Sequence, residues 1–372
     1  MSALIAGHLR RRSRGVAVLS GRSAILWCRG RKLWHRLRVS AGLELGRATG
    51  RDAPVVTPPR RWNTMQALPI IDLDGLSGGG AALDRIAGEI GAACRSIGFF
   101  YVRGHGVPER LIAAVFEQAA AFFALPVEQK AVIDMGLVGD NRGYVAMRGE
   151  ALDPSRPPDL KEGFNLGFDP PDRPARNAFP DLPGFRGTML AYFAEAQALG
   201  LRLHRAIARD LGIAEDFFEP LFDRPMSTLR LLHYPPQPPA AEAGQIGAGE
   251  HTDYGNLTLL MTDAVGGLEV RTRAGKWLAA PPIPGAYVVN IGDCLMRWTN
   301  DVYVSTPHRV VNRTGRERYS VPFFLDPNPD APVAAIPSCV PVGAAPKYPP
   351  ITARAHLTEK LDASYAHRRT RS

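Results

Sequence analysis

The chain is poor in cysteine, with four in 372 residues, and none of them forms a CxxC motif. Disulfide frameworks and thiolate zinc sites need cysteines at characteristic short spacings, whereas Cys28, Cys94, Cys294 and Cys339 are far apart. The sequence therefore predicts neither, and it is typical of a protein from a reducing compartment. Cys94 lies among alanine and isoleucine in a helical pattern, so we expect a buried thiol there.

The sequence also lacks a long apolar run and, over most of its length, an excess of positive charge. A bilayer span needs about 20 apolar residues, and Arg22 interrupts the apolar runs of the amino-terminal segment. Residues 1–64 carry 13 Arg and one Lys against two acidic residues, whereas residues 65–372 carry 31 basic and 34 acidic residues. The formal charge of +9 thus comes from the first segment, and we expect neither a nucleic-acid partner nor a membrane span.

The basic segment 1–64 has several possible explanations. Its arginine-rich, acid-poor composition is similar to that of an organelle transit peptide. Met65 opens "MQALPIIDLDGL", where a folded pattern first appears, so translation could begin there. We expect a disordered leader that is either a targeting segment or the product of an upstream start; a basic surface-binding arm is a third reading. The expected location is cytoplasmic, or an organelle if the leader is a transit peptide.

The amino-terminal half of the remaining chain has helical spacing. Apolar residues that recur every three or four positions predict helices over residues 81–97, 108–124 and 185–211, with another near Pro126. "GFFYVRG" reads as a strand between the first two. Residues 136–183 are rich in Gly, Pro, Asp and Arg, which predicts long loops with short strands, and such stretches are usually functional.

After Pro225 the pattern changes to short apolar or alternating runs separated by turn residues, such as "STLRLLHY", "LTLLMT", "AYVVNIG" and "YSVPFF". This pattern favours a β-sandwich or jelly roll. The expected fold is mainly β with flanking helices (α+β), in which a jelly-roll core follows a helical amino-terminal region. We expect one compact catalytic unit, with an amino-terminal region at 65–180, the core at 181–357 and a basic tail at 358–372.

The segment "EHTDYGN" places His251 two residues before Asp253, ahead of an apolar strand. If both side chains stand at the mouth of that strand, they point to the same side. "STPHRVV" supplies His308 at the start of another strand. Two histidines and one carboxylate form the facial triad of non-haem Fe(II) oxygenases, which leaves three metal positions open. The alternative is a solvated loop with unrelated histidines.

Ten residues after His308, the segment "RYS" places Arg318 and Ser320 on one strand face. A guanidinium and a hydroxyl together suit a carboxylate in a partly buried site. A 2-oxo-dicarboxylic acid bound to the metal would present such a group. The alternative for Arg318 is a surface ion pair with Glu317 or Asp326.

Together these motifs make the sequence recognisable. It resembles the isopenicillin N synthase-like branch of the iron(II)- and 2-oxoglutarate-dependent dioxygenases, which includes plant flavonoid and gibberellin oxygenases and the bacterial ethylene-forming type. The resemblance extends from Leu68 to about Pro329 and rests on "LPIIDLDGL", "GFFYVRGHGVP", "HYPPQP", "HTDYGNLTLL", "STPHRVVN" and "RYSVPFF". It implies a double-stranded β-helix, which is a jelly roll with flanking helices.

The resemblance also implies roles for individual residues and a reaction. The expected iron ligands are His251, Asp253 and His308. The expected contacts to 2-oxoglutarate are Arg318, Ser320 and Tyr234. Fe(II), 2-oxoglutarate and dioxygen would then oxidise a small organic substrate by hydroxylation or desaturation, with release of succinate and CO2. Many plant members have asparagine two residues before the tyrosine, where this chain has Leu232, and this weakens a plant-like substrate assignment.

Other residues have less certain roles. "GDNRGYVAM" and "DLKEGFNLG" occupy a region that often faces substrate in the family, and they supply the candidate substrate contacts Arg142, Tyr144, Lys161 and Phe164; loop anchoring is an equal alternative. Asn290 and Asp293 either orient the metal region or cap a turn, and we favour the turn.

Several other functions remain open from the sequence. An iron oxidase that does not use 2-oxoglutarate has a similar pattern, including the arginine–serine pair, and an ethylene-forming oxygenase is a further possibility. A non-catalytic metal-binding protein would need no Arg318–Ser320 pair, and a hydrolytic zinc site would give that pair no task. The partner is expected to be a small-molecule substrate, and a monomer is compatible with the sequence.

Overall fold

The computed structural model describes residues 17–20, 23–26, 67–153, 155–236 and 244–364. The chain divides into two units, residues 1–61 and 62–372. In the first unit β1 (Ala17–Ser20) and β2 (Ser23–Leu26) form an antiparallel pair, and the rest of the expected leader lies outside the described residues. Across the described ranges, no helix has both the length and the apolar character of a bilayer span.

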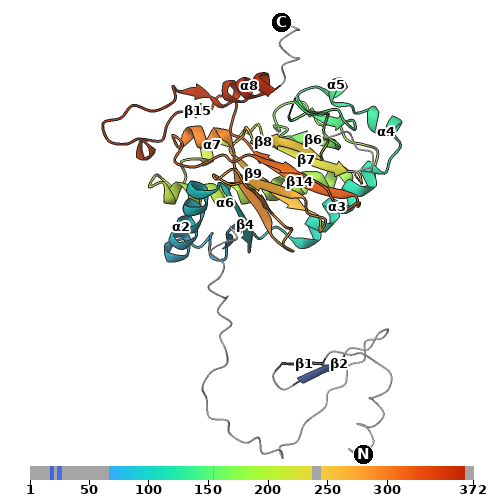
Figure 1. The fold of residues 1–372 in the computed structure, drawn as a ribbon, viewed down its shortest axis with the longest axis horizontal. Coiled ribbons are helices and arrows are strands. Elements are labelled where there is room, and N and C mark those ends of the chain that lie inside the picture. Colours follow the sequence, from blue (N-terminus) through green and yellow to red (C-terminus); the bar gives the residue numbers. More distant parts are fainter. Residues whose placement is uncertain (1–16, 21–22, 27–66, 154, 237–243, 365–372) are drawn as a thin grey trace, which may run out of the picture. The chain divides into compact units, whose positions relative to one another are not determined.

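The second unit is built around two antiparallel sheets (Figure 1). The strands of the larger sheet are, in spatial order, β3 (Ile70–Asp72), β4 (Phe99–Arg103), β12 (Tyr287–Ile291), β9 (Leu257–Thr262), β14 (Arg318–Leu325), β7 (Thr228–Tyr234), β6 (Glu162–Gly167) and β5 (Gly143–Val145). The smaller sheet contains β11 (Trp277–Ala279), β10 (Leu268–Arg271), β13 (His308–Val310) and β8 (Ala248–His251). One pair, β3 with β4, is parallel. The predicted jelly roll is confirmed.

Helices cover the outer face of the larger sheet. Those predicted from apolar spacing are α2 (Gly80–Ser96), α3 (Glu109–Phe123), α4 (Val127–Ala131) and α6 (Phe185–Asp210). The buried apolar residues of α2, α3 and α6 form one hydrophobic cluster with residues of the sheet, and Cys94 in α2 is a buried free thiol, as predicted. The shorter helical elements are α5 (Met135–Val138), η2 (Glu219–Leu221), α7 (Asp293–Trp298), η3 (Pro337–Cys339) and α8 (Ala353–Ser364). A small pair, β15 (Pro332–Val333) with β16 (Ile351–Thr352), lies near the carboxyl end.

Side-chain alternation along the central strands separates the helix-covered core from a pocket. On β14, Tyr319, Val321, Phe323 and Leu325 contribute to the core under the helices, whereas Arg318, Ser320, Pro322 and Phe324 line the pocket. The same alternation holds on β12, where Val289 packs in the core and Asn290 faces the pocket. A strand of period two therefore supplies both packing and chemistry.

The structure differs from the sequence expectations in two places that matter for the site. His251 and Asp253 do not stand at the mouth of one strand: His251 ends β8 of the smaller sheet, and Asp253 lies in the turn that leads to β9 of the larger sheet. The two side chains meet because the chain crosses between sheets at this turn. Residues 358–364, which we assigned to a basic tail, belong to α8, whereas residues 365–372 lie outside the described ranges.

Candidate active site

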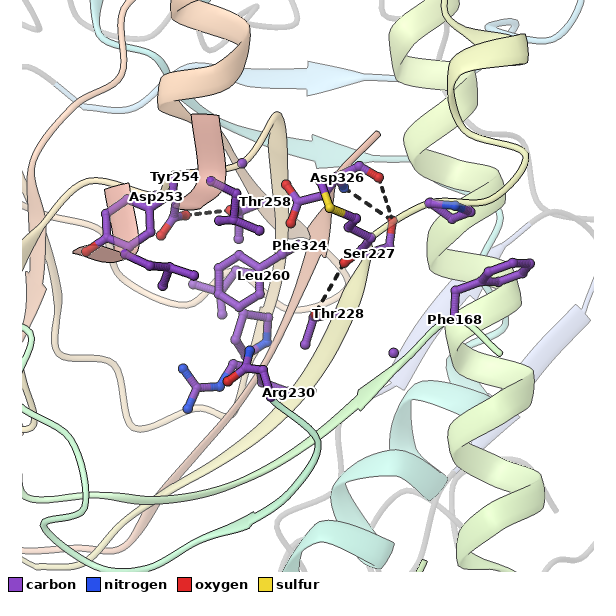
Figure 2. A pocket seen from close by; sticks show the side chains of 18 of the residues that line it. Phe168, Ser227, Thr228, Arg230, Asp253, Tyr254, Thr258, Leu260, Phe324 and Asp326 are labelled. Carbon is purple, nitrogen blue, oxygen red and sulfur yellow. Dashed lines mark hydrogen bonds between the residues drawn. The ribbon is translucent and has the colours of Figure 1, made fainter. Parts of the chain in front are cut away.

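A cavity of about 900 Å3 lies between the two sheets. Its walls come from β7, β9, β12 and β14 of the larger sheet and from β8, β10 and β13 of the smaller one, and α8 contributes Arg354, Leu357 and Leu361. Figure 2 shows one part of it, where Asp253 and Thr258 lie at one end of a row that continues past Leu260 and Phe324. A cavity of this size accommodates ligands as large as a typical drug molecule.

The three expected metal ligands converge inside this cavity. His308 begins β13 and is the direct cross-strand partner of His251 on β8, so their ring centroids are 4.3 Å apart. Oδ1 of Asp253 lies 3.8 Å from Nε2 of His251 and 3.7 Å from Nε2 of His308. One ligand atom from each residue falls within 4.8 Å of the others. This spacing suits a single ion held on one side.

Hydrogen bonds fix the orientation of both imidazoles. Nδ1 of His251 lies 2.8 Å from the carbonyl oxygen of Gly249, and Nδ1 of His308 lies 3.2 Å from that of Thr306. Each Nδ1 must therefore carry the proton, because a carbonyl can only accept. With Nδ1 engaged in this way, Nε2 is the nitrogen of each ring that faces Oδ1 of Asp253, which is the arrangement typical of metal-binding histidines. Burial, together with the neighbouring His308, lowers the pKa of His251 to about 3, so its ring is neutral.

The carboxylate of Asp253 is held from the opposite side. Thr258 and Asn290 both donate to Oδ2, Asn290 at 2.7 Å, and this leaves Oδ1 facing the histidines. Burial opposes ionisation, but His308, His251 and these two donors together lower the pKa of Asp253 below its ordinary value. Asn290 thus orients the carboxylate of an expected metal ligand, which corresponds to the first of its two alternative roles and not to the turn that the sequence favours.

Arg318 lies in the same cavity and is almost fully buried, at 1% exposure. Its Nε donates to the carbonyl of Gly266 at 2.6 Å, and its guanidinium carbon lies 4.6 Å from the ring centroid of its cross-strand partner Tyr234. Its Nη1 has no hydrogen-bond partner among the residues that the structure describes. The surface ion pair considered from the sequence does not fit this burial. A buried cation with an unsatisfied donor calls for an anion, and Ser320, two residues along the same face, also lines the cavity.

The candidate substrate contacts fall into two groups. Arg142 and Lys161 line the cavity, although both are already ion-paired. Arg142 pairs with Asp169, and Lys161 lies 3.4 Å from Glu150.

The other two candidates belong to the hydrophobic core, away from the cavity lining. Tyr144 is 2% exposed and donates its hydroxyl to Oε2 of Glu162 at 2.6 Å. Phe164 is fully buried and packs edge-on against Phe122 and Phe185. Their placement corresponds to the anchoring alternative.

The cavity contains residues that we did not select from the sequence. Thr228 and Arg230 line the cavity from β7 (Figure 2). They alternate along the strand in step with Tyr234, so the pattern of "STLRLLHY" could have identified them. Arg230 donates to Glu150 at 2.8 Å, and although burial opposes it, this cation and Lys161 lower the pKa of Glu150 to about 2. No comparable pattern pointed to α8, because its hydrophobic face is weak.

Comparison with known proteins agrees with this geometry. The sequence profile of the non-haem dioxygenase amino-terminal family, described from morphine synthesis, matches residues 68–182, and that of the 2OG-Fe(II) oxygenase superfamily matches residues 225–327. The chain belongs to this superfamily. It is a 2-oxoglutarate-dependent non-haem iron dioxygenase that uses Fe(II), 2-oxoglutarate and dioxygen and oxidises a small organic molecule.

The relatives of this oxygenase cover most of its length. It is 40% identical over 318 residues to the 2-oxoglutarate-Fe(II) type oxidoreductase hxnY of Emericella nidulans, which corresponds to 80% of this chain and 90% of that protein. It is 36% identical over 342 residues to the clavatol oxidase claD of Penicillium crustosum, covering 84% and 99% of the two chains. The crystal structure of a full-length Neurospora crassa protein in complex with alpha-KG superposes with a TM-score of 0.74 at 36% identity, covering 80% of this chain and 96% of that one. These similarities favour the 2-oxoglutarate-dependent reaction over the alternatives left open by the sequence.

Proposed function

We propose that His251, Asp253 and His308 hold the iron, and that Arg318, with Ser320 and Tyr234, holds the distal carboxylate of 2-oxoglutarate. The observation that carries this assignment is the unpartnered Nη1 of Arg318, which is buried in the same cavity as the triad. The donor set is also chemically suitable, since two imidazoles and one carboxylate suit Fe(II).

The residues of the chain would divide the work as follows. Iron and 2-oxoglutarate, when bound, supply the oxidising chemistry that consumes dioxygen and releases succinate and CO2. The triad would hold the iron through one ligand atom of each residue, and a set of three protein ligands would allow the co-substrate and dioxygen to bind the same ion. Asp253 offsets part of the metal charge, and Thr258 and Asn290 hold that carboxylate in place. Arg318 orients the co-substrate by a charge-assisted contact.

We further propose that the substrate is a compact, ring-containing molecule with hydrogen-bonding groups. The cavity combines apolar walls, such as Leu260 and Phe324, with the polar side chains of Thr228, Arg230 and Asp326 (Figure 2). Apolar walls with a few placed polar groups select small organic ligands. The same Neurospora crassa protein, which has also been solved with alpha-KG and thymine, provides a related example at 35% identity.

The proposal is tested by anaerobic titration with Fe(II) and 2-oxoglutarate, followed by admission of oxygen and assay of succinate and ethylene. Pyrimidines, substituted aromatic rings and arginine derivatives are then added in turn. We expect both ligands to bind, and at least one ring compound to stimulate succinate release. Iron binding without 2-oxoglutarate consumption across the whole panel would contradict the co-substrate assignment, and ethylene as the main product would contradict the substrate assignment.

A further inference from the structure

The carboxyl-terminal helix α8 forms part of the wall of the active-site cavity. Leu357 and Leu361, one turn apart, and Arg354 all line that cavity. The first turn of the helix is anchored by backbone hydrogen bonds of 3.0 Å, from Ala353 to Ala331 and from Arg354 to Pro329. The remainder of α8 depends on side-chain contacts, and two of these lead to the segment that carries the metal ligands.

The first contact is a chain of three polar residues. Lys360 on α8 lies 2.7 Å from Oδ2 of Asp293, and the same oxygen accepts the hydroxyl of Thr252 at 3.1 Å. Thr252 stands between His251 and Asp253. The backbone N–H of Asp293 also donates to the carbonyl of Asp253 at 2.8 Å. The Asp293 side chain is only 4% exposed, and its Oδ2 is held between the ammonium of Lys360 and the hydroxyl of Thr252.

The second contact runs from His356 to the next residue of the same segment. Nε2 of His356 lies 3.1 Å from the carbonyl oxygen of Tyr254, so this nitrogen donates. The histidine is 3% exposed and faces inward from α8. Tyr254 itself lines the cavity beside Asp253 (Figure 2). The helix therefore contacts Tyr254, after Asp253, directly, and is linked to Thr252, before Asp253, through Asp293.

We infer that α8 is coupled to the metal-ligand turn, residues 251–256, through Lys360 and His356, so that metal binding at the turn docks α8 against the cavity. Lys360 is a positioning residue in this arrangement, since it acts on the turn through Asp293. The inference rests on the metal site proposed above. Coupling of this kind is reciprocal: whatever metal binding contributes to the docking of α8, the docked helix contributes to metal affinity.

The test uses the full chain and Fe(II) alone, under anaerobic conditions, with hydrogen–deuterium exchange measured for peptides covering residues 353–364. We expect Fe(II) to slow exchange in α8 by about 5-fold or more, at the lower end of typical coupling between sites. In K360M this protection should fall, and the Kd for Fe(II) should rise by the same factor by which the protection falls. K360R keeps the charge, so both the protection of α8 and the Kd for Fe(II) should stay close to their wild-type values.

K347M is the matched control. It removes another lysine–aspartate pair, Lys347 with Asp301 at 3.0 Å, which does not contact the turn, so both measurements should stay at wild-type values. If K360M does not fold, T252V provides a second test, because it removes the hydrogen bond from Thr252 to Asp293. It should reduce the protection of α8 in the same way. Normal Fe(II) binding without any protection of α8 would overturn the coupling and leave the metal site standing. Absence of Fe(II) binding to the wild-type protein would instead overturn the proposed site.

Discussion

Two parts of the active-site cavity are built in different ways: the part around the triad and Arg318, called the metal end, and the part lined by loops. The metal end consists of strand termini and cross-strand partners whose polar atoms are held by further residues; His308 and Arg318 there are 7% and 1% exposed. The loop-lined part of the cavity includes Arg176 and Arg224, whose side chains are 51% and 53% exposed and which pair with the acidic residues Asp140 and Asp172. Strands thus position the triad and Arg318, while the exposed loops are available to contact the substrate.

The largest effect is expected at the metal end, from His251→Ala. Loss of one ligand from a site with three should reduce succinate formation by more than the roughly 100-fold that loss of an outer-shell partner can bring. Activity and Fe(II) affinity are measured together, and circular dichroism confirms folding. Glu250→Ala is the neighbouring control, because Glu250 pairs with Arg271 on the outside of the strand. Retention of wild-type Fe(II) affinity in the His251 variant would refute its role as a ligand.

The next largest effect is expected from Arg318→Leu. Truncation of one partner in a buried charge pair costs about 2–5 kcal/mol, so the affinity for 2-oxoglutarate should fall by roughly 30-fold to several thousandfold. Fe(II) should still bind, because Arg318 contacts none of the triad residues in the described hydrogen bonds. Arg313→Leu, at an arginine whose side chain is 68% exposed, should leave both affinities unchanged. An unaltered Kd for 2-oxoglutarate in Arg318→Leu would show that Arg318 does not bind the co-substrate.

The difference between these two parts of the cavity also explains what the sequence could predict. The metal end follows from short-range patterns: a strand of period two places Arg318 and Ser320 on one face, and apolar runs mark the strands that carry His308 and Tyr234. The jelly roll and its helices follow from the same periodicities. The long helix over residues 185–211 is predictable because its apolar residues recur on one face.

Other features of the site and its surroundings depend on tertiary contacts that no local pattern contains. Tyr144 and Phe164 come from a loop-rich region with the polarity of a binding surface, yet the structure packs them in the core against α3 and α6. The position of α8 over the cavity depends on contacts of Lys360 and His356 with residues more than sixty positions away. The crossing of the chain between sheets at residues 251–253 was likewise missed, since β8 has only four residues and little apolar character.

Within the metal end, the outer partners should have smaller effects than the ligands. Thr258→Val keeps the shape of the side chain but removes the hydroxyl that donates to Asp253. We expect Fe(II) affinity to fall about 10-fold, at the low end of outer-shell effects, because Asn290 still holds the same oxygen. Thr314→Val, whose hydroxyl donates to Asn312 in a surface loop, is the matched control. Equal affinities for both variants would show that the Thr258 contact is dispensable.

The pH dependence of stability reports on a buried carboxyl group in the cavity wall, that of Asp326. Burial raises the pKa of Asp326 to about 7, with a further contribution from Asp253 and against a hydrogen bond from Asn256. Between the unfolded pKa, near 4, and 7, the folded protein keeps a proton that the unfolded chain releases, so stability falls as pH rises. In metal-free protein, Asp326→Asn should remove this term. The free energy of unfolding, compared between wild type and variant at pH 5.5 and 7.5, should differ by about 2 kcal/mol between the two pH values. A constant difference would mean that Asp326 keeps an ordinary pKa.

The smallest effect on catalysis is expected for Tyr144→Phe, which separates core from cavity. The hydroxyl donates to Glu162, whose carboxylate also accepts from Lys130 and lies beside His233. Loss of one hydrogen bond to a charged group should lower the free energy of unfolding by about 1.5 kcal/mol. The Kd for 2-oxoglutarate and the rate of succinate release should stay at wild-type values, because the ring remains in place among Phe122 and its neighbours and contributes nothing to the cavity wall. Chemical denaturation and the succinate assay measure the two quantities on the same preparation. A raised KM for a stimulating substrate with unchanged stability would show that Tyr144 belongs to the substrate site and not to the core.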